Sequence, residues 1–280
     1  MQLIVQSRPA YAYTGGKALA DSGDCVVFIH GALHDHSVWT LLARWCAHHG
    51  HRVLALDLPG HGRSAGPALA SVEALGAWVL TALASAGLGP DDPVAYVGHS
   101  LGSLIALEAA AQAASQAASH AGRLVMVGTA YPMAVSPALL ALAAEAPQQA
   151  IALVNQLSIS TLAAKPSFPG PGQWLHGSNR ALMRRVLAGP HAASSVPNLF
   201  HHDFSLCDRY VNGLIAAAQV RCPATLVLGR SDQMTPPRQA SALAAGLHAR
   251  VVTLDAGHSL MAEAPDALLQ ALRQALADPA

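Results

Sequence analysis

The sequence is poor in charged and aromatic residues. Of its 280 residues, only 11% are Asp, Glu, Lys or Arg and 5% are Phe, Trp or Tyr, whereas 52% are hydrophobic. A chain with so much apolar surface and so little charge is expected to fold. Its 16 basic and 16 acidic residues balance, so no excess of positive charge attracts nucleic acid or anionic lipid. We therefore expect a small-molecule partner, and neither nucleic acid nor a membrane.

Cysteine is also scarce, and long apolar runs are missing. The four cysteines show no CxxC spacing, and Cys25 and Cys222 border apolar runs. Four buried thiols are therefore expected, with no disulfide framework. No strongly apolar run reaches the roughly 18 residues of a membrane span. The first residues lack the basic and apolar regions of a secretory signal. We expect a cytoplasmic protein.

Short apolar runs alternate with alanine-rich stretches along most of the chain. The expected strands are Val26–Ile29, Val53–Leu56, Val94–Val97, Leu124–Val127, Thr225–Leu228 and Val251–Leu254. The expected helices are Trp39–His49, Val72–Ala86, Leu101–His120, Pro237–Leu247 and Ala264–Ala277. Runs without alternation are typical of parallel strands buried on both faces. The predicted fold class is α/β, with a mostly parallel central sheet and helices on both faces. Ala10–Thr14 and Gly16–Ala20 predict an additional edge hairpin.

This alternation stops between residues 131 and 205. No strand-like run occurs there, and Ala164–Gln173 is rich in proline and glycine, which break helices. The flanking segments Pro137–Leu157 and Ser178–Ala188 predict helices, and another is expected near Leu206–Gln219. We interpret residues 131–205 as an inserted helical cap on a core formed by residues 1–130 and 206–280.

The segment Gly98-His99-Ser100-Leu101-Gly102 fits the pattern G-x-S-x-G. Such a short pattern also arises by chance in glycine-rich chains, so its context decides. It follows the expected strand Val94–Val97 and opens the expected helix Leu101–His120. A nucleophilic serine is typically placed at a sharp strand-to-helix turn, where its hydroxyl projects above the sheet. We therefore predict that Ser100 is a catalytic nucleophile.

A serine hydroxyl needs a general base at neutral pH. The chain has 15 histidines, so position selects among them. His258 follows the last expected strand, Val251–Leu254, and Asp232 follows Thr225–Leu228. In a parallel sheet these strand ends lie at the same edge as Ser100, and the order Ser, Asp, His is known for such triads. We predict that His258 is the base and Asp232 its orienting acid; a loop histidine and a turn aspartate are the alternatives.

An oxyanion also needs backbone N–H donors. The amide of Leu101 is one candidate, and Ala32, which follows the strand Val26–Ile29, is the second, with its neighbour Leu33 as the alternative. Leu33, His34 and His99 are candidate substrate contacts. Asp203, with His201 and His202, closes the insertion and could reach the pocket. No group of histidines shows a known ligand spacing, so we expect neither metal nor cofactor.

Five segments resemble, in order, the α/β-hydrolase fold family: HGALHDHSVW, DLPGHGRS, GHSLG, LGRSDQMTP and DAGHSLMAEAP. They occupy both ends of the chain and leave residues 131–205 unmatched, where that family inserts its variable cap. The resemblance implies Ser100 as nucleophile, Asp232 as acid and His258 as base, with Ala32 and Leu101 as oxyanion donors. It also implies that Asp57 and Pro59–Ser64 form a structural loop.

Three functions remain open. A serine hydrolase that acts through an acyl-enzyme on a small carboxylic ester or thioester is the first expectation. A carbon–carbon bond hydrolase of ring-fission products also keeps the serine, but such relatives commonly carry an aromatic residue after the base histidine, whereas this chain has Ser259-Leu260-Met261. A non-catalytic ligand-binding protein on the same fold is the third, although such proteins often lose a triad position and this chain retains all three.

Overall fold

The computed structural model describes residues 1–20, 22–89, 91–115, 121–160 and 171–277. Within them, eight strands form one sheet in the order β1-β2-β4-β3-β5-β6-β7-β8. The strands are β1 Gln2–Val5, β2 Arg8–Tyr13, β3 Cys25–Ile29, β4 Arg52–Leu56, β5 Val94–His99, β6 Ala121–Val127, β7 Ala224–Gly229 and β8 Arg250–Leu254. β3 to β8 pair in parallel, whereas β1 and β2 are antiparallel. This mostly parallel sheet confirms the predicted fold class.

The edge hairpin lies earlier in the chain than the sequence predicts. β1 and β2 are joined at Gln6 and Ser7, whose φ angles are 50° and 62°. Both central residues of a two-residue type I′ turn have positive φ, and neither residue is the glycine or asparagine that signals such a turn. Gly15 instead lies against α1, because a Cβ there would overlap Ala47 and the carbonyl of Ala43.

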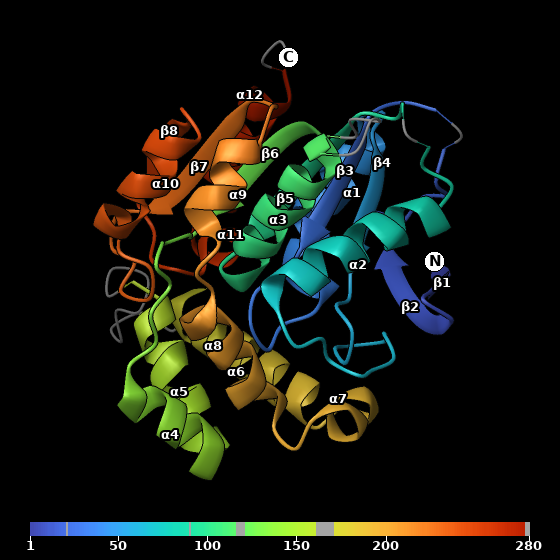
Figure 1. Cartoon of the computed structure of the whole chain (residues 1–280). Coiled ribbons are helices and arrows are strands. Elements are labelled where there is room, and N and C mark those ends of the chain that lie inside the picture. Colours follow the sequence, from blue (N-terminus) through green and yellow to red (C-terminus); the bar gives the residue numbers. More distant parts are fainter. Residues whose placement is uncertain (21, 90, 116–120, 161–170, 278–280) are drawn as a thin grey trace.

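Helices cover both faces of the sheet (Figure 1). Alternate residues of β3 feed two cores: Cys25, Val27 and Ile29 belong to one, Val26 and Phe28 to the other. The first core includes side chains of α2 Val72–Ser85, α3 Leu101–Ser115, α9 Gly213–Gln219 and α10 Ser241–Gly246. The second includes side chains of α1 Thr40–His48, α11 Leu260–Glu263 and α12 Pro265–Ala277. Short 3₁₀ turns, His36–Trp39 and Pro237–Ala240, precede α1 and α10.

The described part of residues 131–205, the segment that the sequence predicts as a cap, is largely helical, but its helices are divided differently. They are α4 Pro137–Glu145, α5 Pro147–Ser158, α6 Pro171–Leu187, α7 Pro190–Ser195 and α8 Leu199–Arg209. Pro147 separates α4 from α5, because the residue before a proline is driven out of the helical region; Ala146 has φ −139°. Most of the expected proline–glycine linker lies outside the described residues.

The single helix expected near Leu206–Gln219 is two helices, α8 and α9. The chain leaves the helical region at Tyr210 and re-enters a helix at Gly213. Because α8 crosses residue 205, the helical layer over the sheet continues past the predicted cap boundary (Figure 1). In the described part of the chain, no helix is long and apolar enough to cross a membrane.

Candidate active site

Ser100 occupies the turn between β5 and α3. Its φ of 54° lies in the left-handed region, which non-glycine residues rarely adopt. Two glycines permit this turn: a Cβ on Gly98 would overlap the carbonyl oxygen of Gly102, and a Cβ on Gly102 would overlap the carbonyl of His30. The pattern G-x-S-x-G therefore reflects close backbone packing around a strained serine, which is the geometry of a nucleophile elbow.

Asp232 and His258 meet at the carboxyl ends of β7 and β8. His258 Nδ1 lies 2.8 Å from Asp232 Oδ2. The other carboxylate oxygen accepts the backbone N–H groups of Met234 and Thr235, each at 2.8 Å, and the Thr235 hydroxyl donates to Oδ2 at 2.7 Å. Burial favours a higher pKa for Asp232, but His258 and these donors outweigh it and lower the pKa. The carboxylate is therefore charged and fixed, and it directs Nδ1–H of His258 toward itself.

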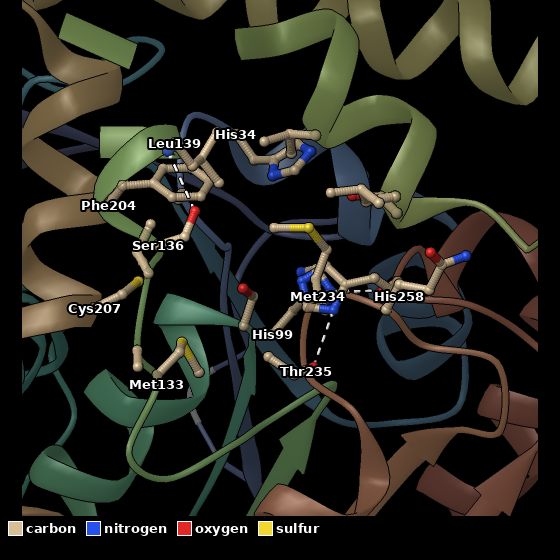
Figure 2. Close-up of a pocket in the computed structure, with 18 of the residues that line it drawn as sticks. His34, His99, Met133, Ser136, Leu139, Phe204, Cys207, Met234, Thr235 and His258 are labelled. Carbon is tan, nitrogen blue, oxygen red and sulfur yellow. Dashed lines mark hydrogen bonds between the residues drawn. The ribbon is translucent and has the colours of Figure 1, made fainter. Parts of the chain in front are cut away.

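Ser100 and His258 line one pocket of about 190 Å³ beneath the cap. Phe204 and Cys207 face Met234 and His258 across it (Figure 2). The core residues that line it are Ala32, His34, His99, Ser100, Gln233, Met234, Thr235 and His258. The remaining lining residues are Met133, Ala134, Val135, Ser136, Leu139, Val154, Leu157, Ser158, Met183, Phe204 and Cys207. Sequence patterns could not identify this second set, because no motif marks the cap.

The expected oxyanion donors lie beside Ser100. Ala32 lines the pocket, and Leu101 is the first residue of α3, where helix N–H groups lack intrahelical acceptors. Among the described residues, no protein group accepts the N–H of Ala32 or of Leu101. The alternative donor, Leu33, is already engaged, since its N–H donates to Asp203 Oδ2 at 2.8 Å. This arrangement favours Ala32 over Leu33.

The three candidate substrate contacts separate. The prediction for Leu33 is not supported by its position: its side chain is fully buried in the hydrophobic core and does not line the pocket. His34 and His99 do line the pocket. His99 Nε2 donates to the carbonyl of His258 at 2.9 Å. Burial, with His258 and His34 nearby, holds the pKa of His99 well below its usual range. His99 is therefore a neutral ring that holds the backbone of His258.

A buried network of hydrogen bonds joins α8 to the loops that follow β3 and β4. Asp203 of α8 accepts His61 Nε2 at 2.9 Å on the oxygen that also accepts Leu33 N–H. His61 Nδ1 lies 3.2 Å from the carbonyl of Pro59, so both ring nitrogens face acceptors, an arrangement that favours the protonated ring. Burial favours a lower pKa for His61, but Asp203 raises it. The sequence placed Asp203 only within reach of the pocket; its partners are distant in the chain.

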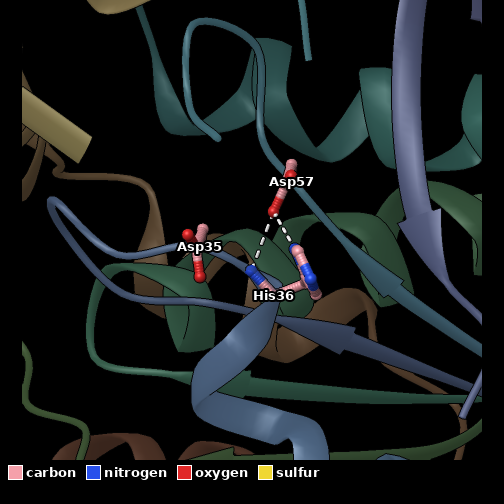
Figure 3. Close-up of side chains that lie close together, drawn as sticks. All are labelled: Asp35, His36 and Asp57. Atoms are coloured by element: carbon pink, nitrogen blue, oxygen red, sulfur yellow. Dashed lines mark hydrogen bonds and ion pairs between the residues drawn. The ribbon is translucent and has the colours of Figure 1, made fainter. Parts of the chain in front are cut away.

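Asp35, His36 and Asp57 form a second cluster of polar side chains (Figure 3). Asp57 Oδ1 accepts both the backbone N–H and Nδ1–H of His36, each at 2.8 Å. Asp57 Oδ2 accepts Arg63 N–H at 2.9 Å, and Asp35 pairs with Arg185 of α6 at 2.7 Å. These bonds join the loop after β3 to the loop after β4, and Asp35 joins the first of these loops to α6, so that Asp57 is engaged by backbone and side-chain donors of both loops.

Comparison with known proteins shows to which family the chain belongs. A model of the Alpha/beta hydrolase family matches residues 26–271. The chain therefore belongs to the alpha/beta hydrolase family, as the sequence motifs predict.

Two curated relatives match part of the chain. It is 40% identical over 89 residues to the pimeloyl-[acyl-carrier protein] methyl ester esterase of Methylococcus capsulatus, and this match covers 31% of this chain and 32% of that protein. It is 36% identical over 103 residues to the (E)-2-((N-methylformamido)methylene)succinate hydrolase of Acinetobacter baylyi, which covers 36% of each. The chain thus spans about a third of the length of the curated relatives it matches.

Solved structures resemble the whole chain. An enol-lactonase from Burkholderia xenovorans LB400 superposes with a TM-score of 0.79 at 19% identity, covering 99% of this chain and 100% of that one. A thermophilic esterase from Thermogutta terrifontis superposes with a TM-score of 0.75 at 18% identity, covering 98% and 96%. At such low identity these likenesses establish the fold.

Proposed function

We propose that this protein is a serine hydrolase that cleaves a small carboxylic ester or thioester through an acyl-enzyme on Ser100. The observation that carries the proposal is that the strained Ser100 and His258 line one pocket, while the Asp232 carboxylate lies 2.8 Å from His258 Nδ1 behind it. A serine becomes nucleophilic when a base oriented in this way takes its proton.

The proposed reaction has two halves. His258 Nε2 takes the Ser100 hydroxyl proton while Oγ attacks the substrate carbonyl, and the N–H groups of Ala32 and Leu101 stabilise the resulting oxyanion. The intermediate collapses, the bond to the leaving alcohol or thiol breaks, and His258 returns the proton to that leaving group. Water then attacks the acyl-enzyme with His258 as base, which releases the carboxylic acid and restores Ser100.

The pocket supports a short, uncharged acyl group. Its wall is largely apolar, with Leu139, Val154, Leu157, Met183 and Phe204 on the cap side. Its volume of about 190 Å³ is near that of an engineered cavity of about 150 Å³ that binds benzene. The names of the esterase and lactonase among the similar proteins also favour hydrolysis of a carbonyl–oxygen bond.

The test is hydrolysis of p-nitrophenyl esters from acetate to octanoate and of matched thioesters, with Ser100→Ala as control. We expect turnover of the short acyl chains and its loss in the variant. A fluorophosphonate probe should label the wild type at Ser100 and leave the variant unlabelled. Undiminished turnover by Ser100→Ala would refute the nucleophile. Cleavage of a vinylogous diketone without ester turnover would favour the carbon–carbon hydrolase, and ligand binding without labelling would favour a non-catalytic protein.

A further inference from the structure

A second cavity adjoins the catalytic pocket. It has a volume of about 580 Å³, about three times the 190 Å³ of the pocket that contains Ser100. It lies between α6 of the cap and the segment that begins α1, and its wall is mostly apolar, with Leu41, Leu182 and Met261 as examples. Leu41 is 64% exposed, so this cavity opens to solvent.

Two histidines line both cavities, His34 and His99. Among the described residues they are the side chains that the two cavities share, so both cavities reach the same pair of rings. Figure 2 shows His34 on the cap side of the catalytic pocket, away from Thr235. His34 therefore lines the pocket that contains Ser100 and the second cavity at once.

A directed chain of hydrogen bonds fixes the protonation of the His34 ring. His34 Nε2 lies 2.9 Å from Asn179 Oδ1, Asn179 Nδ2 donates to Asn155 Oδ1 at 3.0 Å, and Asn155 Nδ2 lies 3.1 Å from His176 Nδ1. Since Asn179 presents its oxygen, Nε2 of His34 carries the proton. Burial outweighs the bond from Asn179 and lowers the pKa of His34, so the ring is neutral and Nδ1 keeps its lone pair.

That lone pair has no protein partner. Within the described residues, His34 Nδ1 is buried and makes no hydrogen bond. A buried acceptor without a donor costs free energy, and native structures seldom leave one without a reason. A ligand that supplies an O–H or N–H group at this point would remove that cost.

We propose, on the basis of the hydrolase function above, that the second cavity binds the leaving-group side of the substrate and that His34 Nδ1 selects for a donor on it. The acyl group stays bonded to Ser100 and must fit the smaller pocket, whereas the leaving group must depart toward solvent. The substrate class is an ester or thioester with a short apolar acyl group and a larger, mostly apolar alcohol or thiol part. That part carries a hydroxyl or N–H group near the scissile bond.

Binding of free alcohols tests this proposal independently of catalysis. The probes are 3-phenylpropane-1,2-diol and 3-phenylpropan-1-ol, titrated by calorimetry into Ser100→Ala and into Ser100→Ala with His34→Phe. For each protein we take the ratio of the two dissociation constants and then compare the two ratios. Any difference between the two proteins that affects both alcohols equally cancels in this comparison. We expect the ratio to favour the diol about fivefold more with His34 than with Phe, the range of one neutral hydrogen bond.

Two further variants separate the hydrogen bond from the cavity. Asn155 lines neither cavity, so Asn155→Ala should reduce the preference for the diol by releasing the His34 tautomer. Ala181 lines the second cavity and is exposed, so Ala181→Trp should weaken both alcohols about tenfold or more, while Arg180→Trp on the same helix should not.

The outcomes distinguish this proposal from the hydrolase itself. An equal preference for the diol with His34 and with Phe overturns the role of His34. Equal binding by Ala181→Trp and Arg180→Trp overturns the assignment of the cavity. Neither result depends on turnover, so a protein that binds the diol through His34 but hydrolyses no ester would refute only the catalytic proposal.

Discussion

Removal of the negative charge at Asp203 should destabilise the protein and slow it. Asp203 is 1% exposed, and its Oδ2 accepts both Leu33 N–H and His61 Nε2–H. In Asp203→Asn the side chain keeps its shape but loses the negative charge that stabilises the protonated form of His61. Breaking a buried ion pair costs about 3–5 kcal/mol. In the variant, His61 can lose its extra proton, and the neutral ring can still donate from Nε2 to the amide oxygen of the new side chain. We therefore expect the low end of this range, a loss of roughly 3 kcal/mol in the free energy of unfolding.

The effect on catalysis follows from Leu33. Its N–H bond to Asp203 holds the backbone directly after Ala32, the proposed oxyanion donor. Loss of an oxyanion donor costs about 10²–10³ in kcat, and Asp203→Asn loosens the donor without removing it. We therefore expect a decrease of roughly tenfold in kcat with little change in KM. The assay is steady-state hydrolysis of a short p-nitrophenyl ester, well below the unfolding temperature of the variant.

If the loss of charge at Asp203 causes the destabilisation, the destabilisation must depend on pH. A mere loss of packing would not produce this dependence. The pKa of His61 is raised by Asp203, so its stabilisation is complete below the unfolded value of about 6.5 and is lost as pH rises through the folded pKa. The pKa of Asp203 is lowered, mainly by His61 against the effect of burial. Its stabilisation is present above the unfolded value of about 3.9 and is lost as pH falls through the folded pKa.

Urea unfolding of the wild type and Asp203→Asn should therefore differ most between about pH 4 and pH 6.5, and the difference should shrink at higher pH. Asp208→Asn on the exposed side of the same helix is the matched control, with a change of less than about 1 kcal/mol. A difference that stays constant from pH 5 to pH 9, or an unchanged kcat, would refute the reasoning.

Three further predictions concern the residues around the elbow and the base. Asp232→Asn should lower kcat by about 10⁴, because the amide no longer holds the reactive tautomer of His258; kinetics across pH 6–9 test this, and a loss under tenfold would contradict it. Thr235→Val should lower kcat about tenfold at unchanged KM, since the hydrogen bond from its hydroxyl to the Asp232 carboxylate, worth roughly 1.5 kcal/mol, is lost. An equal decrease in the rate of ester hydrolysis and in the rate of labelling by a fluorophosphonate probe would support this prediction, whereas a change in KM alone would contradict it. Gly102→Ala should unfold well below the wild-type temperature, because its Cβ would overlap the carbonyl of His30; calorimetry that shows an unchanged Tm would contradict this packing.

The edge of the sheet that carries the proposed triad could be predicted from the sequence because its determinants are local. Buried parallel strands appear as short apolar runs, and the residues that follow them, Ser100, Asp232 and His258, must gather at one edge. The β1–β2 turn could not be predicted, since Gln6 and Ser7 carry no turn signal although both have positive φ. Contacts of the cap were equally hidden, because they join residues far apart in the chain.

α8 and the segment after it make hydrogen bonds to the two elements that carry the proposed oxyanion donors. Asp203 bonds to Leu33, 170 positions away in the sequence and next to Ala32. Beyond the end of α8, Tyr210 Oη and Asn212 Nδ2 both donate to Glu108 Oε1 at 2.7 Å, and Glu108 is buried in α3, the helix that Leu101 begins. α8 and the residues directly after it therefore contact both of the elements that carry the proposed donors. If residues 131–212 are exchanged for those of a relative, turnover should consequently be restored only when the new segment brings an acceptor equivalent to Asp203 and a donor equivalent to Tyr210. A graft that matches the pocket wall alone should bind substrate yet turn it over slowly.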